Sequence, residues 1–269
     1  MMGSQEESVD VAQMALYNLN RARKTMEGLS HKNEWQIEDT AEFDCMHYLG
    51  NAAIDNAARE LGLEGGDTVV DIGAGFSATG RYLYRNYGVK VIGVELQKDI
   101  HDLAETIIEK NKVAPSVRSL NVNFLDLDLP APVDHIVSFL CILHIPERNK
   151  LFGKAARVLK TDGKMYIEDF YAREELSGDA KQLLRDVISC PYLPSREQYI
   201  DDLRTAGLET VRFQDMSTEW AEYVHQRAVS YGRQAQQERL LAVFYNTVDQ
   251  LFATGGLGGC RITCVNTKQ

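Results

Sequence analysis

Two glycines and a carboxylate in the first half of the chain have the types and the spacing of a nucleotide-cofactor site. The stretch Val69–Gly80 reads Val-Val-Asp-Ile-Gly-Ala-Gly-Phe-Ser-Ala-Thr-Gly and predicts a buried strand, a glycine turn and a helix. Gly73 and Gly75 can adopt turn dihedrals that side chains disfavour, and they let a ligand approach the main chain closely. Glu95 ends the next apolar run, about 20 residues after Gly75, where a carboxylate can accept hydrogen bonds from both hydroxyls of a ribose.

The residues around this turn distinguish two classes of cofactor. A dinucleotide site favours a third glycine that packs a helix close to its strand under a pyrophosphate, but Ala78 stands at that position and the next glycine is Gly80. Asp71 adds a negative charge that would repel a pyrophosphate and attract the ammonium and sulfonium groups of S-adenosylmethionine. A nicotinamide oxidoreductase is therefore the less favoured alternative.

The string Val-Asp-Ile-Gly-Ala-Gly resembles the first motif of the class I S-adenosylmethionine-dependent methyltransferases. Further motifs follow in the order of that family over residues 66–171. Asp126 and Leu127 come after the apolar run Val122–Phe124, at a point where an aspartate of those enzymes binds the adenine amino group and an apolar neighbour covers the ring. The resemblance implies that the cofactor contacts Asp71, Gly73, Ala74, Gly75, Glu95, Leu96, Asp126, Leu127 and Leu140.

The elements that must position these residues alternate between strand and helix patterns. Asp134–His144 resembles the fourth strand of the methyltransferase fold with its exit loop, and helical spacing over Leu151–Leu159, a stop at Lys160–Gly163 and the stretch Lys164–Asp169 predict the next helix and strand. We expect an α/β fold, a Rossmann-like, seven-stranded, mostly parallel sheet with helices on both faces. Residues 1–60 are expected to form an N-terminal helical cap, 61–172 the S-adenosylmethionine-binding core, and 173–269 a lid, the remaining strands and a helical insert before the last strand.

The segments outside the core have patterns of their own. Val9–Met26 and Ala52–Leu61 predict cap helices, and Ala172–Leu193 predicts a lid segment. Ser195–Gln198 has the spacing of a capping box and predicts a helix that ends near Gly207. The last elements expected are a strand over Leu208–Phe213, helical structure over Ser217–Thr254 and a strand over Cys260–Val265.

Over nearly the whole chain, this layout resembles the small-molecule N-methyltransferases that act on glycine, sarcosine and dimethylglycine, and the phosphoethanolamine methyltransferases. The resemblance rests on Ile142–His144, on Glu168-Asp169 at the end of a strand, and on the helical insert. It implies that His144 is catalytic, because the equivalent histidine of the phosphobase enzymes pairs with an N-terminal tyrosine and assists proton removal. Two features depart from those enzymes: Leu140 stands where they usually carry an acid, and Ile188–Tyr192 offers no basic residue for a phosphate.

These departures favour an acceptor with more apolar or aromatic character than phosphoethanolamine. Methyl transfer from a sulfonium requires mainly that the acceptor lone pair is aligned and water excluded, and His144 could accept the proton of an amine. An amine nitrogen is the expected acceptor; oxygen or sulfur acceptors, and a catalytically silent S-adenosylmethionine-binding module, stay open as alternatives. The candidates for binding the substrate are Trp35, Tyr48, Asp169 and Tyr171, and Gln36, His47 and Trp220 are further candidates for lining the site.

Charge and composition narrow the expected partners. The 269 residues include 39 acidic and 29 basic side chains, and the net charge of −10 opposes binding to a nucleic-acid backbone. No apolar run approaches the ~20 residues of a membrane-spanning helix, and the start lacks the pattern of a secretory signal, so we expect a cytoplasmic protein that does not bind membranes. The five cysteines form no Cys-x-x-Cys pair, and no metal site follows from them. We expect a small-molecule methyl acceptor as partner, and a monomer or a homodimer.

Overall fold

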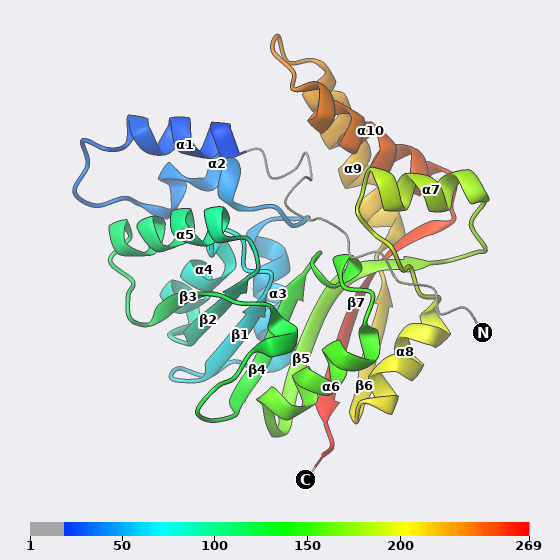
Figure 1. Ribbon diagram of the computed structural model, residues 1–269, viewed down its shortest axis with the longest axis horizontal. Helices are drawn as coiled ribbons and strands as arrows, with labels where there is room; N and C mark the ends of the chain where they lie inside the picture. Colours follow the sequence, from blue (N-terminus) through cyan, green and yellow to red (C-terminus); the bar gives the residue numbers. More distant parts are fainter. Residues whose placement is uncertain (1–18, 269) are drawn as a thin grey trace.

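A seven-stranded sheet forms the centre of the computed structural model, which describes residues 19–268. The strand order is β3-β2-β1-β4-β5-β7-β6, and neighbouring strands are parallel except where β7 pairs with β5 and β6 (Figure 1). The predicted fold class is thus confirmed. The strands are β1 (Thr68–Ile72), β2 (Lys90–Glu95), β3 (Val117–Asn121), β4 (Val133–Phe139), β5 (Leu159–Ala172), β6 (Leu208–Asp215) and β7 (Leu257–Asn266).

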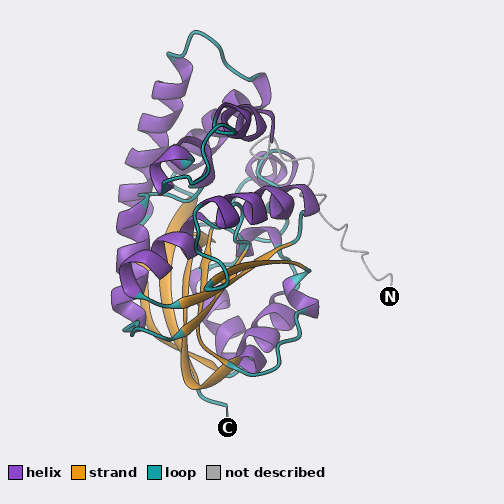
Figure 2. Cartoon of the chain, turned by 90° about the vertical axis from the view of Figure 1, so that its left-hand side faces the viewer, coloured by secondary structure: helices purple, strands orange, loops and turns teal. Residues whose placement is uncertain are grey.

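Helices cover both faces of the sheet, as Figure 2 shows. The α-helices are α1 (Leu19–Gly28), α2 (Ala41–Asp44), α3 (Asn51–Leu61), α4 (Ala78–Tyr87), α5 (Lys98–Lys110), α6 (Arg148–Val158), α7 (Gly178–Asp186), α8 (Arg196–Thr205), α9 (Ser217–Gly232) and α10 (Arg239–Ala253), and the short 3-10 turns are η3 (Ile37–Asp39), η4 (Phe124–Asp126) and η5 (Ile142–His144). Successive side chains of a strand point to opposite faces. In β1, Val69 belongs to the core cluster of α3 and α4, whereas Val70 belongs to the cluster of α6 and α8.

Strand β5 begins earlier than the predicted strand Lys164–Asp169. Gly163, which we expected in a stop between helix and strand, lies inside β5 at a point where the pairing with β4 shifts register. A Cβ at Gly163 would lie 2.8 Å from the carbonyl oxygen of Lys160 and 2.9 Å from that of Asp134. The predicted stop is therefore wrong, because this glycine permits a close approach of backbones at a strand irregularity.

Helices α9 and α10 form the predicted insert between β6 and β7, and they lie side by side at the upper right of Figure 1. The helical region expected over Ser217–Thr254 is two helices, because residues 233–238 leave the helical conformation. Helix α8 begins with the predicted capping box. Ser195 Oγ accepts a hydrogen bond from the Gln198 amide (3.2 Å), and Gln198 Oε1 accepts one from the Ser195 amide (2.8 Å).

A buried arginine attaches the N-terminal cap to the core. Arg81 of α4, which is 0% exposed, donates hydrogen bonds to Asp44 and to Asn111 Oδ1 (2.6 Å). Asn111 Nδ2 in turn donates to the carbonyl oxygen of Trp35 (2.8 Å). Because removing one partner of a buried ion pair is costly, this network holds the cap segment firmly against α4 and α5.

The sequence analysis also predicted two cap helices and a division of the chain into three parts. Helix α3 confirms the prediction over Ala52–Leu61. The helix predicted over Val9–Met26 is seen from Leu19 onward, and its earlier part lies outside the described residues. The division of the chain at residues 60 and 172 stays a prediction.

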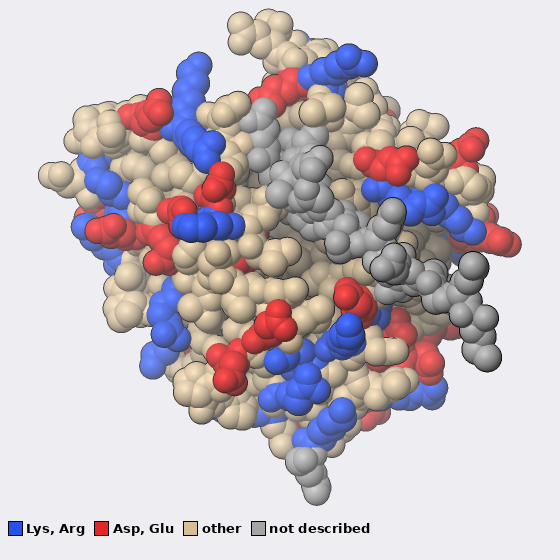
Figure 3. Space-filling view, viewed as in Figure 1, with Lys and Arg blue, Asp and Glu red and all other residues tan. Residues whose placement is uncertain are grey.

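Membrane-spanning and metal-binding features are not found in the part of the chain that the structure describes. None of its helices is long and apolar enough to cross a membrane. Residues 19–268 contain no group of three or more His, Cys, Asp or Glu side chains placed to hold a metal ion. On the face drawn in Figure 3, acidic and basic side chains are interspersed.

Candidate active site

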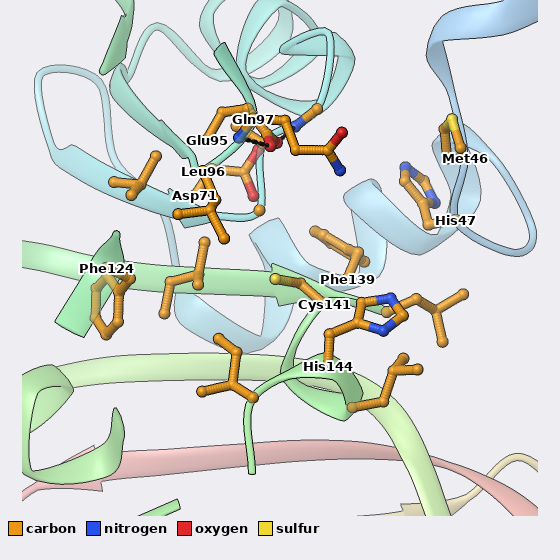
Figure 4. Close-up of a pocket in the computed structure, with 18 of the residues that line it drawn as sticks. Met46, His47, Asp71, Glu95, Leu96, Gln97, Phe124, Phe139, Cys141 and His144 are labelled. Carbon is orange, nitrogen blue, oxygen red and sulfur yellow. Dashed lines mark hydrogen bonds between the residues drawn. The ribbon is translucent and has the colours of Figure 1, made fainter. Parts of the chain in front are cut away.

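A cavity of about 300 Å³ lies at the carboxyl ends of β1, β2 and β4, where α/β sheets bind their ligands. The loops after these strands line it together with the segment before α3, the turn η5 and parts of α9 and α10. Figure 4 shows Asp71 and Glu95 on one side of the hollow, with Phe139, Cys141 and His144 across from them. We call the first side the cofactor end and the second, which also includes Tyr48 and the residues of α9 and α10, the acceptor end.

The predicted glycine turn follows β1 and forms the floor of the cofactor end. Gly73 and Gly75 have φ angles of +73° and +53°, which favour glycine. A Cβ at Gly73 would lie 2.3 Å from Cys141 Sγ, so a side chain does not fit there. The cavity is lined by the predicted residues Asp71, Gly73, Ala74, Gly75, Glu95, Leu96 and Leu140.

Two buried carboxylates make the cofactor end acidic. Glu95 Oε2 accepts a hydrogen bond from the Gly75 amide (3.0 Å), and Oε1 accepts one from the Gln97 amide (2.9 Å). Burial raises the pKa of Glu95, and these amides counteract that rise. Burial, assisted by the charge of Glu95, raises the pKa of Asp71 to about 7.

This arrangement fits S-adenosylmethionine better than a dinucleotide. A pyrophosphate would need free backbone amides at the turn, but the Gly75 amide already donates to Glu95, and two carboxylates would repel it. The same carboxylates attract cationic groups. Asp71 and Glu95 would therefore hold the polar and charged parts of S-adenosylmethionine, with the glycine turn giving close access to the backbone.

Where the sequence predicts the adenine end of the site, the residues that line the cavity come a few positions earlier than Asp126 and Leu127. Residues 122–125 line the cavity, whereas Asp126 is exposed and Leu127 is buried in the main core cluster. The cause is η4, which begins at Phe124 and turns the following residues away. Asn123 stands at the start of this turn and accepts a hydrogen bond from the Leu125 amide (3.0 Å). Asn123 and Phe124 are thus cavity residues that the sequence analysis missed, although asparagine before a short turn is a recognisable signal.

His144 ends the turn η5 and lines the acceptor end. Its Nδ1 lies 2.8 Å from the carbonyl oxygen of Ser189. Because a carbonyl can only accept, Nδ1 carries the proton and Nε2 has a free lone pair. Burial lowers the pKa of His144 to about 4, so the imidazole is neutral at physiological pH.

Aromatic side chains from separate segments surround this histidine. Tyr48 comes from the cap, Phe139 ends β4 and Phe170 lies on β5. Burial raises the pKa of Tyr48 to about 12, so its hydroxyl stays protonated. His47 also lines the cavity, and burial lowers its pKa. Arg227 of α9, which sequence reasoning missed because no local pattern sets it apart, lies over the Tyr48 ring at 4.8 Å from its centroid.

Three predicted substrate-binding residues lie elsewhere. Trp35 is buried in a cluster under α1, where its Nε1 donates to the Leu29 carbonyl oxygen (3.1 Å). Tyr171 packs edge-on against Phe213, with ring centroids 5.4 Å apart. Asp169 is fully buried and does not line the cavity. Of the four substrate-binding candidates, Tyr48 alone is brought to the cavity.

Asp169 instead supports the turn that holds His144. Its carboxylate accepts hydrogen bonds from the Leu143 amide (3.1 Å) and the Tyr199 hydroxyl (2.8 Å), and it pairs with Arg148 at 3.4 Å. A buried carboxylate at the end of a strand was a reasonable sign of a ligand contact. Here its lone pairs are taken by η5, α6 and α8, so it positions the site from behind.

Two examples illustrate the solved structures that share the fold of this chain. Phosphoethanolamine N-methyltransferase 2 of Haemonchus contortus, in complex with phosphomonomethylethanolamine and S-adenosylhomocysteine, superposes with a TM-score of 0.73 at 20% identity, covering 81% of this chain and 53% of that one. The cyclopropane synthase MmaA2 of Mycobacterium tuberculosis superposes with a TM-score of 0.72 at 20% identity, covering 87% of each chain. Identities this low show the fold alone, which is the class I methyltransferase fold.

Sequence similarity extends these comparisons. A sarcosine/dimethylglycine N-methyltransferase of Halorhodospira halochloris is 26% identical over 181 residues, which cover 67% of this chain and 62% of that enzyme. The aligned part thus spans less than two thirds of the relative's length. The family model described as mycolic acid cyclopropane synthetase matches residues 40–261, which is most of the chain. The chain therefore belongs to the mycolic acid cyclopropane synthetase family, whose members are S-adenosylmethionine-dependent methyltransferases.

Proposed function

We propose that this chain transfers the methyl group of S-adenosylmethionine to the nitrogen of a small-molecule amine. The observation that carries the proposal is His144, a neutral imidazole with a free Nε2 lone pair in the same cavity as Asp71 and Glu95. When bound, S-adenosylmethionine supplies a methyl group that is already electrophilic. The chain itself must then orient the acceptor, exclude water and receive a proton.

A neutral histidine suits an amine acceptor in two ways. Its Nε2 can accept a hydrogen bond from the amine N–H, which turns the nitrogen lone pair toward the methyl group. As the nitrogen gains positive charge in the reaction, its proton can move along the same hydrogen bond to Nε2 and on to solvent, because an imidazole with a pKa of about 4 does not retain it. The Ser189 carbonyl keeps the imidazole in this tautomer, and the low pKa keeps Nε2 unprotonated throughout the neutral range.

The aromatic walls favour nitrogen over oxygen or thiol acceptors. Methyl transfer to an amine forms an ammonium, and an ammonium over an aromatic face gains about 0.5–2 kcal/mol. The rings of Tyr48, Phe139 and Phe170 line the acceptor end. Methylated alcohols and thiols are neutral and would gain nothing comparable from these rings.

The experiment is a methyl-transfer assay with separate pools of amines, phenols and thiols, with methylated products and S-adenosylhomocysteine read by mass spectrometry. We expect products from the amine pool alone, and turnover that falls in His144→Ala. His225→Gln is the matched control, because His225 is exposed on α9 and pairs with Asp249 at 3.1 Å. Products from the phenol or thiol pool alone would contradict the nitrogen acceptor, and cofactor binding without turnover in any pool would favour a silent module.

A further inference from the structure

Four apolar side chains form one side of the acceptor end. Leu143 lies in η5, Phe170 on β5 and Phe244 on α10, and Ile188 follows α7. All four line the cavity and belong to one buried core cluster, and none is more than 6% exposed. We call these four residues the apolar wall. It presents apolar surface to any group that enters this part of the cavity.

The apolar wall lies next to the imidazole that binds the amine in the proposed function. Leu143 directly precedes His144 in η5. Ile188 directly precedes Ser189, whose carbonyl oxygen lies 2.8 Å from His144 Nδ1. The segments that fix the histidine thus also carry two residues of the wall. An amine whose N–H donates to His144 Nε2 would therefore have its nitrogen substituent close to the wall.

Several polar groups around the acceptor end are already bonded within the protein. His47 Nδ1 lies 3.2 Å from the carbonyl oxygen of Tyr48, and its Nε2 lies 3.5 Å from Cys45 Sγ. Asp44, which also lines the cavity, pairs with Arg81. A hydroxyl, carboxylate or phosphate placed against the apolar wall would lose its water and gain no partner from the wall, which is costly. A methylene buried at the same place is favourable.

The cation at this end of the cavity does not require an anionic acceptor. Arg227 lines the cavity, and its guanidinium lies 4.8 Å from the ring centroid of Tyr48 and 4.6 Å from that of Tyr245. Aromatic faces attract a cation. S-adenosylmethionine also carries a carboxylate of its own, so a loaded site contains an anion whatever the acceptor is. Arg227 therefore leaves the chemistry of the acceptor's substituent open, and the apolar wall decides it.

We propose that the methyl acceptor is an amine whose nitrogen carries an apolar aliphatic or aromatic group, and that Phe244 and Ile188 limit the size of this group. Such a group displaces water from the apolar wall, and each methylene buried there strengthens binding about fourfold. The inference rests on the proposed function, because it takes an amine nitrogen at His144 as given, and it names the class of that amine.

The test uses amines that differ in one group. Purified protein with S-adenosylmethionine is given straight-chain amines from methylamine to hexylamine, and benzylamine. Ethanolamine, phosphoethanolamine and glycine are the polar counterparts. Methylated products are measured by mass spectrometry, and kcat/KM is determined for each amine. We expect kcat/KM to rise about fourfold per methylene up to the size that the wall admits. Propylamine should exceed ethanolamine, which has the same number of heavy atoms, by about tenfold or more.

Two variants test the apolar wall itself, and the quantity compared is the ratio of kcat/KM for hexylamine to that for propylamine. Phe244→Leu makes room and should raise this ratio about tenfold, whereas Ile188→Phe fills the space and should lower it about tenfold. Phe252→Leu is the matched control, because Phe252 lies on α10 in the same core cluster and does not line the cavity. It should leave the ratio as it is. A ratio of two substrates in one protein does not depend on the folded fraction, and the cofactor Kd of each variant establishes that the cofactor end is intact.

The outcomes distinguish this inference from the proposed function. Equal kcat/KM for propylamine and ethanolamine, with an unchanged ratio in Phe244→Leu, would overturn the role of the apolar wall and leave the proposed function standing. A preference for glycine or phosphoethanolamine over every apolar amine would overturn the substrate class in the same way. Absence of transfer to every amine in a protein that binds S-adenosylmethionine would overturn the proposed function itself, and this inference with it.

Discussion

The two ends of the cavity are built in different ways. The cofactor end takes its residues from the last positions of β1 and β2 and from the short segments that follow β1, β2 and β3, and it is acidic. The acceptor end collects single side chains from the cap, η5, β5 and the insert, among them the rings of Tyr48, Phe139 and Phe170. The two carboxylates of the first end suit a cationic methyl donor, and the aromatic rings of the second suit an amine that becomes an ammonium.

This difference between the two ends indicates which residues determine cofactor binding and which determine the choice of acceptor. The cofactor end depends on backbone geometry, with Gly73 held against Cys141 and the Gly75 amide bound to Glu95. The acceptor end depends on how peripheral elements pack, since Asp169 and Arg148 fix η5 from behind and the Arg81 network fixes the cap. Substitutions at the first should affect cofactor affinity, and substitutions at the second should affect turnover and acceptor choice.

The largest expected effect is at the glycine turn. Gly73→Val places a Cβ 2.3 Å from Cys141 Sγ and forces a positive φ on a branched residue. Strain and overpacking of about 4 kcal/mol should weaken S-adenosylmethionine binding on the order of 1000-fold, measured by calorimetry. Gly178→Ala is the control, because a Cβ there meets nothing within 4 Å. Tight binding by Gly73→Val would mean that the turn is not the cofactor's cradle.

Asp169 should have the next largest effect, and it acts on the acceptor end alone. Asp169→Asn leaves the buried Arg148 without its counter-charge and weakens the contact with the Leu143 amide. We expect the free energy of unfolding, measured with urea, to fall by about 3 kcal/mol. Asp249→Asn, whose partner His225 is exposed, should cost less than about 1 kcal/mol.

Asp169→Asn also separates the two ends by function. Because Asp169 does not line the cavity, we expect a lower kcat and an unchanged cofactor Kd in the folded fraction of the variant. An unchanged kcat would show that η5 does not need Asp169 to hold His144 in place.

His144 is expected to affect turnover and not cofactor affinity. His144→Ala should lower kcat about 100-fold, because it removes both the hydrogen-bond acceptor and the proton acceptor. His144→Gln keeps an acceptor oxygen and should retain about a tenth of the activity, which separates orientation from proton transfer. Equal kcat values in wild type and both variants would remove His144 from the mechanism.

The pH dependence follows from the lowered pKa of His144. Protonated Nε2 cannot accept, so the contribution of His144 should be complete above about pH 5 and lost as the pH falls through about 4. Any rise in rate between pH 6 and 9 should then come from ionisation of the amine acceptor and persist in His144→Gln.

The smallest effect tests the adenine end. Asn123→Ala removes a cavity side chain and the cap of η4, and it should weaken cofactor binding about fivefold, or about 1 kcal/mol. Asp126→Ala changes an exposed residue outside the cavity and should leave the Kd as it is. The reverse result would restore the family-based assignment of Asp126.

The contrast between the two ends of the cavity also explains how much of the fold and of the site could be predicted from the sequence. Apolar runs and glycine turns in the sequence indicate the strands and helices of the core. The sheet, and the cavity residues from Asp71 to Glu95, could therefore be predicted from local patterns. Asn123 and Phe124 were missed as cavity residues because η4 leaves Asp126 exposed, which depends on where a short turn begins.

The acceptor end could be predicted only in part. His144 and Tyr48 could be named through the family resemblance, and both line the cavity. Trp35, Tyr171 and Asp169 have equally suitable side chains, but they point into the cap cluster, toward Phe213 and behind η5. Arg227 carries no local signal, because its place depends on how the insert packs over the sheet.

The most direct test of the account is a single-turnover reaction with S-adenosylmethionine labelled by carbon-13 in its methyl group and an amine acceptor found in the pool assay, followed by carbon NMR. The account predicts that the label moves to an N-methyl resonance, quickly in wild type and about 100-fold more slowly in His144→Ala. A label that stays on sulfur while the cofactor is bound, or that appears on carbon or oxygen, would contradict it.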